Sequence, residues 1–97
     1  MRTVKAEALR DAVAELCIRA NRKLPPDVRA AIDAARAAEP WPAAERSLGL
    51  LLDNMALAAE KQLPVCQDTG LACVFLELGQ DVHIDGDLDA AVQAGIR

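Results

Sequence analysis

Residues 64–70, Pro-Val-Cys-Gln-Asp-Thr-Gly, divide the sequence into two parts of different character. The residues before them are rich in Ala and Leu and show helical spacing, whereas those after them contain short apolar and alternating runs. A proline at one end, a glycine at the other and polar residues between them predict a loop. We therefore predict a helical segment at residues 1–62 and a segment at residues 63–97 that holds this loop, strands and a helix.

Three helices are predicted before the loop, with prolines between them. The first runs from about Val4 to Asn21, with Thr3 as its cap. The second begins at Pro26, where the missing N–H of a proline costs nothing, and the third covers about residues 43–62. Their apolar faces are expected to form the core: Leu9, Val13, Leu16, Cys17 and Ala20 in the first, Val28, Ala31, Ile32 and Ala35 in the second, and Leu48, Leu51, Leu52, Met55 and Ala59 in the third.

Beyond the loop, the sequence predicts a short β-hairpin and then a further helix. Residues 71–78 are apolar and of strand length, and after a turn residues 82–84 alternate like a second strand. The last helix begins at about Leu88, with Asp87 as its cap. The fold class is thus α+β, and the chain reads as a single partial domain, because two strands alone make a marginal sheet. The last helix reaches Arg97 without a capping residue, so we expect the natural chain to continue or to need a partner.

The charge and the apolar pattern exclude several classes of protein. The net charge is −4, which does not suit a nucleic-acid surface or a polybasic membrane anchor. No apolar run approaches the roughly 20 residues of a membrane-spanning helix. Charged residues interrupt the N-terminus where a secretory signal would need an apolar stretch. We therefore expect a cytoplasmic protein that binds neither nucleic acid nor membrane.

The loop offers a thiol, an amide, a carboxylate and a hydroxyl next to one another. Pro64 stiffens its entry, and Gly70 permits backbone conformations that other residues resist. Cys66, Gln67 and Asp68 could therefore bind an ion and orient a polar substrate. A polar turn that contains a chance cysteine explains the same composition equally well, since turns favour these residue types.

The loop and its flanks resemble the iron–sulfur (class I) fumarate hydratases and the L-tartrate dehydratases. In that family a Cys-Gln-Asp-Thr-Gly run follows a proline and an aliphatic residue, as it does here. The similarity extends to five flanking segments: residues 16–21, 24–28, 71–75, 79–84 and 89–97. It begins close to Met1, without the longer N-terminal region of the single-chain enzymes. In this respect the chain resembles the separate α subunit of the two-subunit form.

This resemblance implies the N-terminal portion of a larger hydro-lyase α-subunit fold. It implies a [4Fe–4S] cluster held by three cysteines, with Cys66 as a ligand, whose open iron acts as a Lewis acid. The implied reaction is reversible hydration of fumarate to malate, a step of the tricarboxylic acid cycle, with L-tartrate dehydration as the alternative. Gln67 and Asp68 match residues that approach the bound dicarboxylate, and Asp68 would also move a proton or orient the substrate hydroxyl. A β subunit and an oligomeric assembly are implied as well.

Other potential ligands are expected to have no part in this chemistry. Cys17 lies on the apolar face of the first helix and Cys73 in the predicted strand, where buried thiols are usual. His83 alternates with apolar neighbours and is expected to face solvent. With only Cys66 as a ligand, these 97 residues alone are expected to hold no stable cluster and to be inactive. A hypothesis of another class is a non-enzymatic helical interaction domain with Cys66 as a structural or redox thiol.

Overall fold

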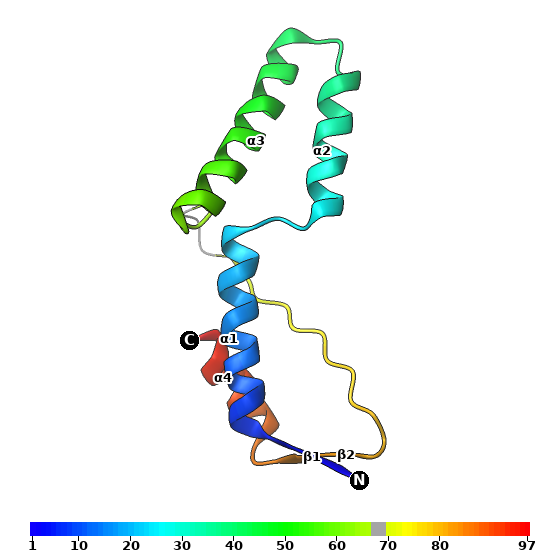
Figure 1. The fold of residues 1–97 in the computed structure, drawn as a ribbon, viewed down its shortest axis with the longest axis vertical. Coiled ribbons are helices and arrows are strands. Elements are labelled where there is room, and N and C mark those ends of the chain that lie inside the picture. The colour runs from blue at the N-terminus through cyan, green and yellow to red at the C-terminus, as the bar shows by residue number, and fades with distance from the viewer. Residues whose placement is uncertain (67–69) are drawn as a thin grey trace. The chain divides into compact units, whose positions relative to one another are not determined.

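The computed structural model describes residues 1–66 and 70–97. In chain order they form six elements (Figure 1): β1 (Arg2–Lys5), α1 (Ala6–Arg22), α2 (Pro26–Ala38), α3 (Pro42–Lys61), β2 (Val82–Asp85) and α4 (Leu88–Ile96). The chain folds as two compact units. One, called the terminal unit below, takes its described residues from Met1–Arg19 and Asp68–Arg97. The other, the central unit, takes them from Ala20–Gln67.

β1 and β2 form a two-stranded parallel sheet in the terminal unit. Arg2 pairs with Val82 and Lys5 pairs with Asp85, so the start of the chain lies against a segment near its end (Figure 1). The predicted β-hairpin is therefore wrong, because the partner of β2 is the N-terminal strand and not the residues just before β2. Parallel strands need a long connection, and here α1, α2 and α3 lie in that connection.

Because residues 2–5 form a strand, the first helix starts later than the sequence predicted. Thr3 and Val4 belong to β1, and α1 begins at Ala6. The prediction that Thr3 caps a helix starting near Val4 is therefore wrong. Both residues are β-branched and suit an extended conformation, and pairing of Thr3 with His83 and of Val4 with Ile84 outweighs the helical pattern that follows them.

Residues 71–78 form no strand in this structure, although their apolar composition predicted one. All of them are exposed, including Leu71 at 90% and Phe75 at 95%. A strand needs a partner for its backbone hydrogen bonds, and within the described part of the chain β2 pairs only with β1. The buried strand is therefore a wrong prediction. The α+β class is confirmed by the helices and the short sheet.

α4 packs against α1 through a glycine. A Cβ at Gly95 would lie 2.6 Å from the carbonyl oxygen of Arg10 and 2.8 Å from the Cβ of Val13. A second close approach occurs at Gly86, between β2 and α4, where a Cβ would lie 2.6 Å from the Cβ of Ala6 and where φ is +121°. Ala6 and Val13 are buried, so small residues allow the elements of the terminal unit to approach closely.

The later helices confirm the sequence-based boundaries. α2 begins at Pro26 and α4 at Leu88, as predicted, while α3 covers Pro42–Lys61 against the predicted 43–62. Asp87 caps α4, since its Oδ1 accepts a hydrogen bond from the backbone N–H of Ala90 at 3.1 Å. Prolines and caps act on neighbouring residues only, which is why these boundaries are readable from the sequence.

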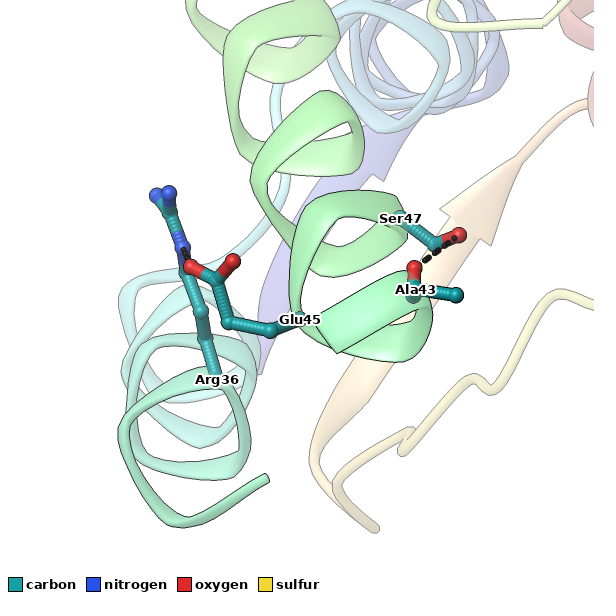
Figure 2. Close-up of polar contacts among 4 residues, drawn as sticks. All are labelled: Arg36, Ala43, Glu45 and Ser47. Atoms are coloured by element: carbon teal, nitrogen blue, oxygen red, sulfur yellow. Dashed lines mark hydrogen bonds and ion pairs between the residues drawn. The ribbon is translucent and has the colours of Figure 1, made fainter. Parts of the chain in front are cut away.

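α2 and α3 lie side by side in the central unit (Figure 1). Arg36 Nε donates to Glu45 Oε1 at 2.7 Å, which connects the end of α2 to the start of α3 (Figure 2). This hydrogen bond and the negative charge of Glu45 raise the pKa of the Arg36 guanidinium. The guanidinium lies over Gly49, where a Cβ would be 2.9 Å from Arg36 Cζ. Within α3, the Ser47 hydroxyl donates to the Ala43 carbonyl oxygen at 3.0 Å (Figure 2).

The apolar core of the central unit is thin. Leu52, Met55 and Ala58 of α3 are buried, whereas α2 buries no residue. The predicted apolar face of α3 is confirmed at Leu52 and Met55, whereas Leu51 is 52% exposed, Ala59 is also exposed and Leu48 is half-buried. None of the helices in residues 1–66 and 70–97 has both the length and the hydropathy needed to span a membrane.

Candidate functional site

α3 ends in a turn that leads the chain towards Cys66. Gln62 adopts the left-handed conformation, with φ 55° and ψ 45°. The N–H of Leu63 then donates to the carbonyl oxygen of Ala58 at 3.0 Å, which satisfies a carbonyl at the helix end. Pro64 follows and cannot continue a helix, because it has no N–H to donate. The site loop therefore begins at a defined stop of α3.

Both backbone polar groups of Val65, the residue before Cys66, are hydrogen-bonded. Its N–H donates to the carbonyl oxygen of Asn21, near the end of α1, at 2.7 Å. Its carbonyl oxygen accepts from the side-chain amide of Asn54, on α3, also at 2.7 Å. Both distances lie at the short end of the usual range for N–H···O bonds. Two helices thus fix the backbone at the entry to the predicted site.

Cys66, the predicted metal ligand, is exposed. Its thiol therefore stands at the surface, on a loop whose preceding residue is held in place. An accessible thiol is what a metal or cluster needs from a cysteine ligand, since a thiolate buried among apolar groups is unfavourable. Gln67 and Asp68, the predicted substrate-binding residues, lie outside the described residues.

The remaining candidate residues divide between confirmed and corrected predictions. Cys17, on α1, is half-buried and not fully buried as expected. Cys73 is exposed, so its predicted burial is wrong, because residues 71–78 form no strand that could bury it. His83 is exposed on β2, between the half-buried Val82 and Ile84, as its alternation predicted.

Cys66 fits one ligand position of a cluster and no more. Most iron–sulfur clusters need three or four cysteine thiolates. Among residues 1–66 and 70–97, no three Cys, His, Asp or Glu side chains come together as a metal site would require. A cluster bound through the Cys66 thiolate would therefore need further ligands that do not come together with it among the described residues.

Asn54 is a feature of the site that the sequence reading missed. It stands in α3 between the buried residues Leu52 and Met55, in a run otherwise rich in Ala and Leu. Asn is a poor helix former because its side chain competes for backbone hydrogen bonds. A lone asparagine in such a helix could therefore have indicated a side chain with a specific hydrogen-bond partner. The sequence alone does not show that this partner is Val65.

Comparisons with known proteins cover this site and most of the chain. A family profile described as fumarate hydratase (Fumerase) matches residues 10–97. A protein of Methanocaldococcus jannaschii, provisionally named L(+)-tartrate dehydratase subunit alpha, is 37% identical over 73 residues, which are 75% of this chain and 26% of that protein. A protein of Geobacillus stearothermophilus, provisionally named fumarate hydratase class I, is 39% identical over 66 residues, 67% of this chain and 13% of that protein. No solved structure matches the chain.

The chain thus spans a minor part of the length of either relative. The profile nevertheless covers nearly the whole chain, from within α1 to Arg97, and it includes the Cys66 loop. The match therefore includes both flanks of the loop as well as the loop itself. The chain belongs to the fumarate hydratase (Fumerase) family.

Proposed function

We propose that the chain is part of an iron–sulfur hydro-lyase that reversibly hydrates fumarate to malate, with Cys66 as one thiolate ligand of a [4Fe–4S] cluster. The observation that carries the proposal is the family match over residues 10–97, which includes the whole 64–70 loop. The exposed position of Cys66 and the two hydrogen bonds of Val65 support it. Such a cluster, when bound, supplies an open iron that acts as a Lewis acid on substrate oxygens.

Gln67 and Asp68 follow Cys66 directly, and we propose that they form one wall of the substrate site. The side-chain amide of Gln67 donates a hydrogen bond to a carboxylate of the dicarboxylate. The carboxylate of Asp68 accepts a hydrogen bond from the substrate hydroxyl, which orients that group, and it holds or returns a proton there. Both roles rest on the sequence of the loop and on its resemblance to the family.

Dehydration of L-tartrate is the second candidate reaction. It is favoured by the similarity to the M. jannaschii protein, whose name gives an alpha subunit of L(+)-tartrate dehydratase. We propose from the same name that a second, β-type subunit completes the site and that the assembly is oligomeric. An open iron is readily lost in the presence of oxygen, so we propose a reducing, cytoplasmic location.

The test begins with the complete reading frame that contains these codons, expressed anaerobically with any adjacent β-type gene. Hydration of fumarate and dehydration of L-tartrate are then compared at equal enzyme concentration, and iron and sulfide are measured. We expect a stoichiometric cluster and faster turnover of fumarate. Cys66→Ser should lose both the cluster and the activity, whereas Cys73→Ser, an exposed cysteine in a different segment, should retain both.

Three other outcomes of this experiment would each change a different part of the proposal. If Cys66→Ser keeps both cluster and activity, the ligand assignment is wrong. If L-tartrate is the better substrate, the second candidate reaction replaces the first. If the complete protein binds no cluster and converts neither substrate, the chain is better described as an interaction domain whose Cys66 has a structural or redox role.

A further inference from the structure

Asn54 and Cys66 are connected through one peptide group. The side-chain amide of Asn54 donates to the carbonyl oxygen of Val65 at 2.7 Å. That oxygen belongs to the Val65–Cys66 peptide, which is planar and also contains the nitrogen and Cα of Cys66. A hydrogen bond that fixes the oxygen therefore restricts the orientation of the backbone that carries the Cys66 side chain.

The preceding peptide group is held as well. The N–H of Val65 lies in the Pro64–Val65 peptide plane, and it donates to the carbonyl oxygen of Asn21 at 2.7 Å. With both planes held, the two backbone torsions of Val65 have little freedom, since these torsions are the only soft ones between the planes. The remaining freedom of the Cys66 sulfur lies in the φ torsion of Cys66 and in its side-chain rotamer.

Of the groups that hold Val65, only the amide of Asn54 belongs to a side chain, so only this contact can be removed by a substitution that leaves the backbone groups in place. Asn54 is exposed. When its side-chain amide is removed, water can therefore bond to the Val65 carbonyl oxygen, which avoids the cost of an unpaired group in an apolar core. A substitution at Asn54 should therefore release the loop while α3 and its buried residues, Leu52 and Met55, stay as they are.

We propose that Asn54 is a positioning residue for Cys66, which sets the direction in which the thiolate is offered to the cluster. This inference rests on the proposed function, because it assigns the role of a ligand to Cys66. The assigned role of Asn54 is exerted through the peptide that joins Val65 to Cys66. Groups that orient a ligand in this way commonly change metal retention more than they change the fold.

The experiment compares Asn54→Asp with Asp53→Asn in the complete protein, prepared anaerobically. Asn54→Asp keeps the size of the side chain but replaces the donor with an oxygen that repels the Val65 carbonyl. Asp53→Asn is the matched control, since it makes the converse change at the neighbouring exposed position. The readouts are the EPR spectrum of the reduced cluster, the rate of iron release to a chelator, the melting temperature and amide exchange of residues 63–66 in the apoprotein.

We expect Asn54→Asp to release iron about tenfold faster than the control and to shift the EPR spectrum. Loss of the bond from Asn54 should also loosen the neighbouring bond from the Val65 N–H to Asn21, so amide exchange at Val65 should accelerate by about five- to tenfold. The melting temperatures of the two variants should stay close. Asn54→Gln, which retains the amide on a longer side chain, should restore part of the iron retention.

Two results would overturn the inference in distinguishable ways. If Asn54→Asp matches Asp53→Asn in EPR spectrum, iron release and Val65 exchange while Cys66→Ser loses its cluster, Asn54 has no positioning role but the proposed function stands. If Cys66→Ser keeps its cluster, the ligand assignment fails and the role of Asn54 fails with it. A loss of iron that follows only a fall in melting temperature, with no rescue by Asn54→Gln, would show a structural role and contradict positioning.

Discussion

A Cβ on Gly95 would lie 2.6 Å from the carbonyl oxygen of Arg10, a contact closer than real Cβ atoms make. Because that oxygen belongs to the backbone of α1, it cannot turn away as a side chain could. Gly95→Ala should therefore force α4 away from α1 and lower the free energy of unfolding by about 2–3 kcal/mol, near the upper end for overpacked sites. Urea denaturation followed by circular dichroism measures this change.

Gly49→Ala is the matched control for that substitution. The three atoms nearest to a Cβ at Gly49 all belong to the guanidinium of Arg36, the far end of a flexible side chain that can move aside. Alanine is also the better helix former by about 1 kcal/mol. Gly49→Ala should therefore leave the stability unchanged or raise it, and equal destabilisation by the two substitutions would show that the contact with Arg10 is not the cause.

Gln62→Gly should stabilise the protein. Gln62 is held in the left-handed conformation at the end of α3, with φ 55°, which costs a residue with a side chain about 1 kcal/mol and costs glycine almost nothing. We expect a gain of about 0.5–1 kcal/mol in the free energy of unfolding. Lys61→Gly, one residue earlier and inside the helix, should instead lose about 1 kcal/mol. A loss in both variants would argue against the strain at Gln62.

Asp87→Ala should weaken the start of α4. The Asp87 carboxylate accepts from the N–H of Ala90 at 3.1 Å, and removal of such a cap costs about 1 kcal/mol. Asp87→Ser should be nearly neutral, because serine caps about as well as aspartate. Thermal denaturation of the two variants beside the unsubstituted protein checks both expectations, and equal losses in both would mean that the charge of Asp87, and not its capping, is responsible.

The 97-residue chain by itself should fail to hold a stable cluster. Cys66 is the one thiolate proposed as a ligand, and the described residues contain no set of three suitable side chains, whereas most clusters need three or four. Anaerobic reconstitution followed by desalting should leave far less than one cluster per chain. A stoichiometric cluster that survives desalting would contradict this and would require Cys17 or Cys73 to act as a ligand.

The sequence predicted the features that depend on near neighbours. Prolines and the Asp87 cap gave the helix boundaries, since each acts within one turn of its own position. The Cys66 loop was found because its residue types lie consecutively. The exposure of His83 followed from simple alternation in β2.

Features that join distant residues could not be predicted in this way. Nothing around Arg2 indicates that its partner is Val82, so a hairpin between adjacent segments was the simpler expectation. The apolar run at 71–78 has strand composition, but composition does not provide a partner. The hydrogen bond of Asn54 to Val65 is a contact between a helix side chain and a later loop, and only the folded chain shows it. The roles of Gln67 and Asp68 stay predictions.

The parallel pairing of β1 with β2 has a consequence for the order of folding during synthesis. α2 and α3 are neighbours in the chain and can associate as soon as both have left the ribosome. Arg2–Lys5, although made before both helices, must wait for Val82–Asp85 before it has a partner, and contacts between residues so far apart form slowly. The strand made before α2 and α3 thus reaches its final structure after them, and a nascent chain that stalls before Val82 would carry a helical hairpin together with a strand β1 that has not yet met its partner.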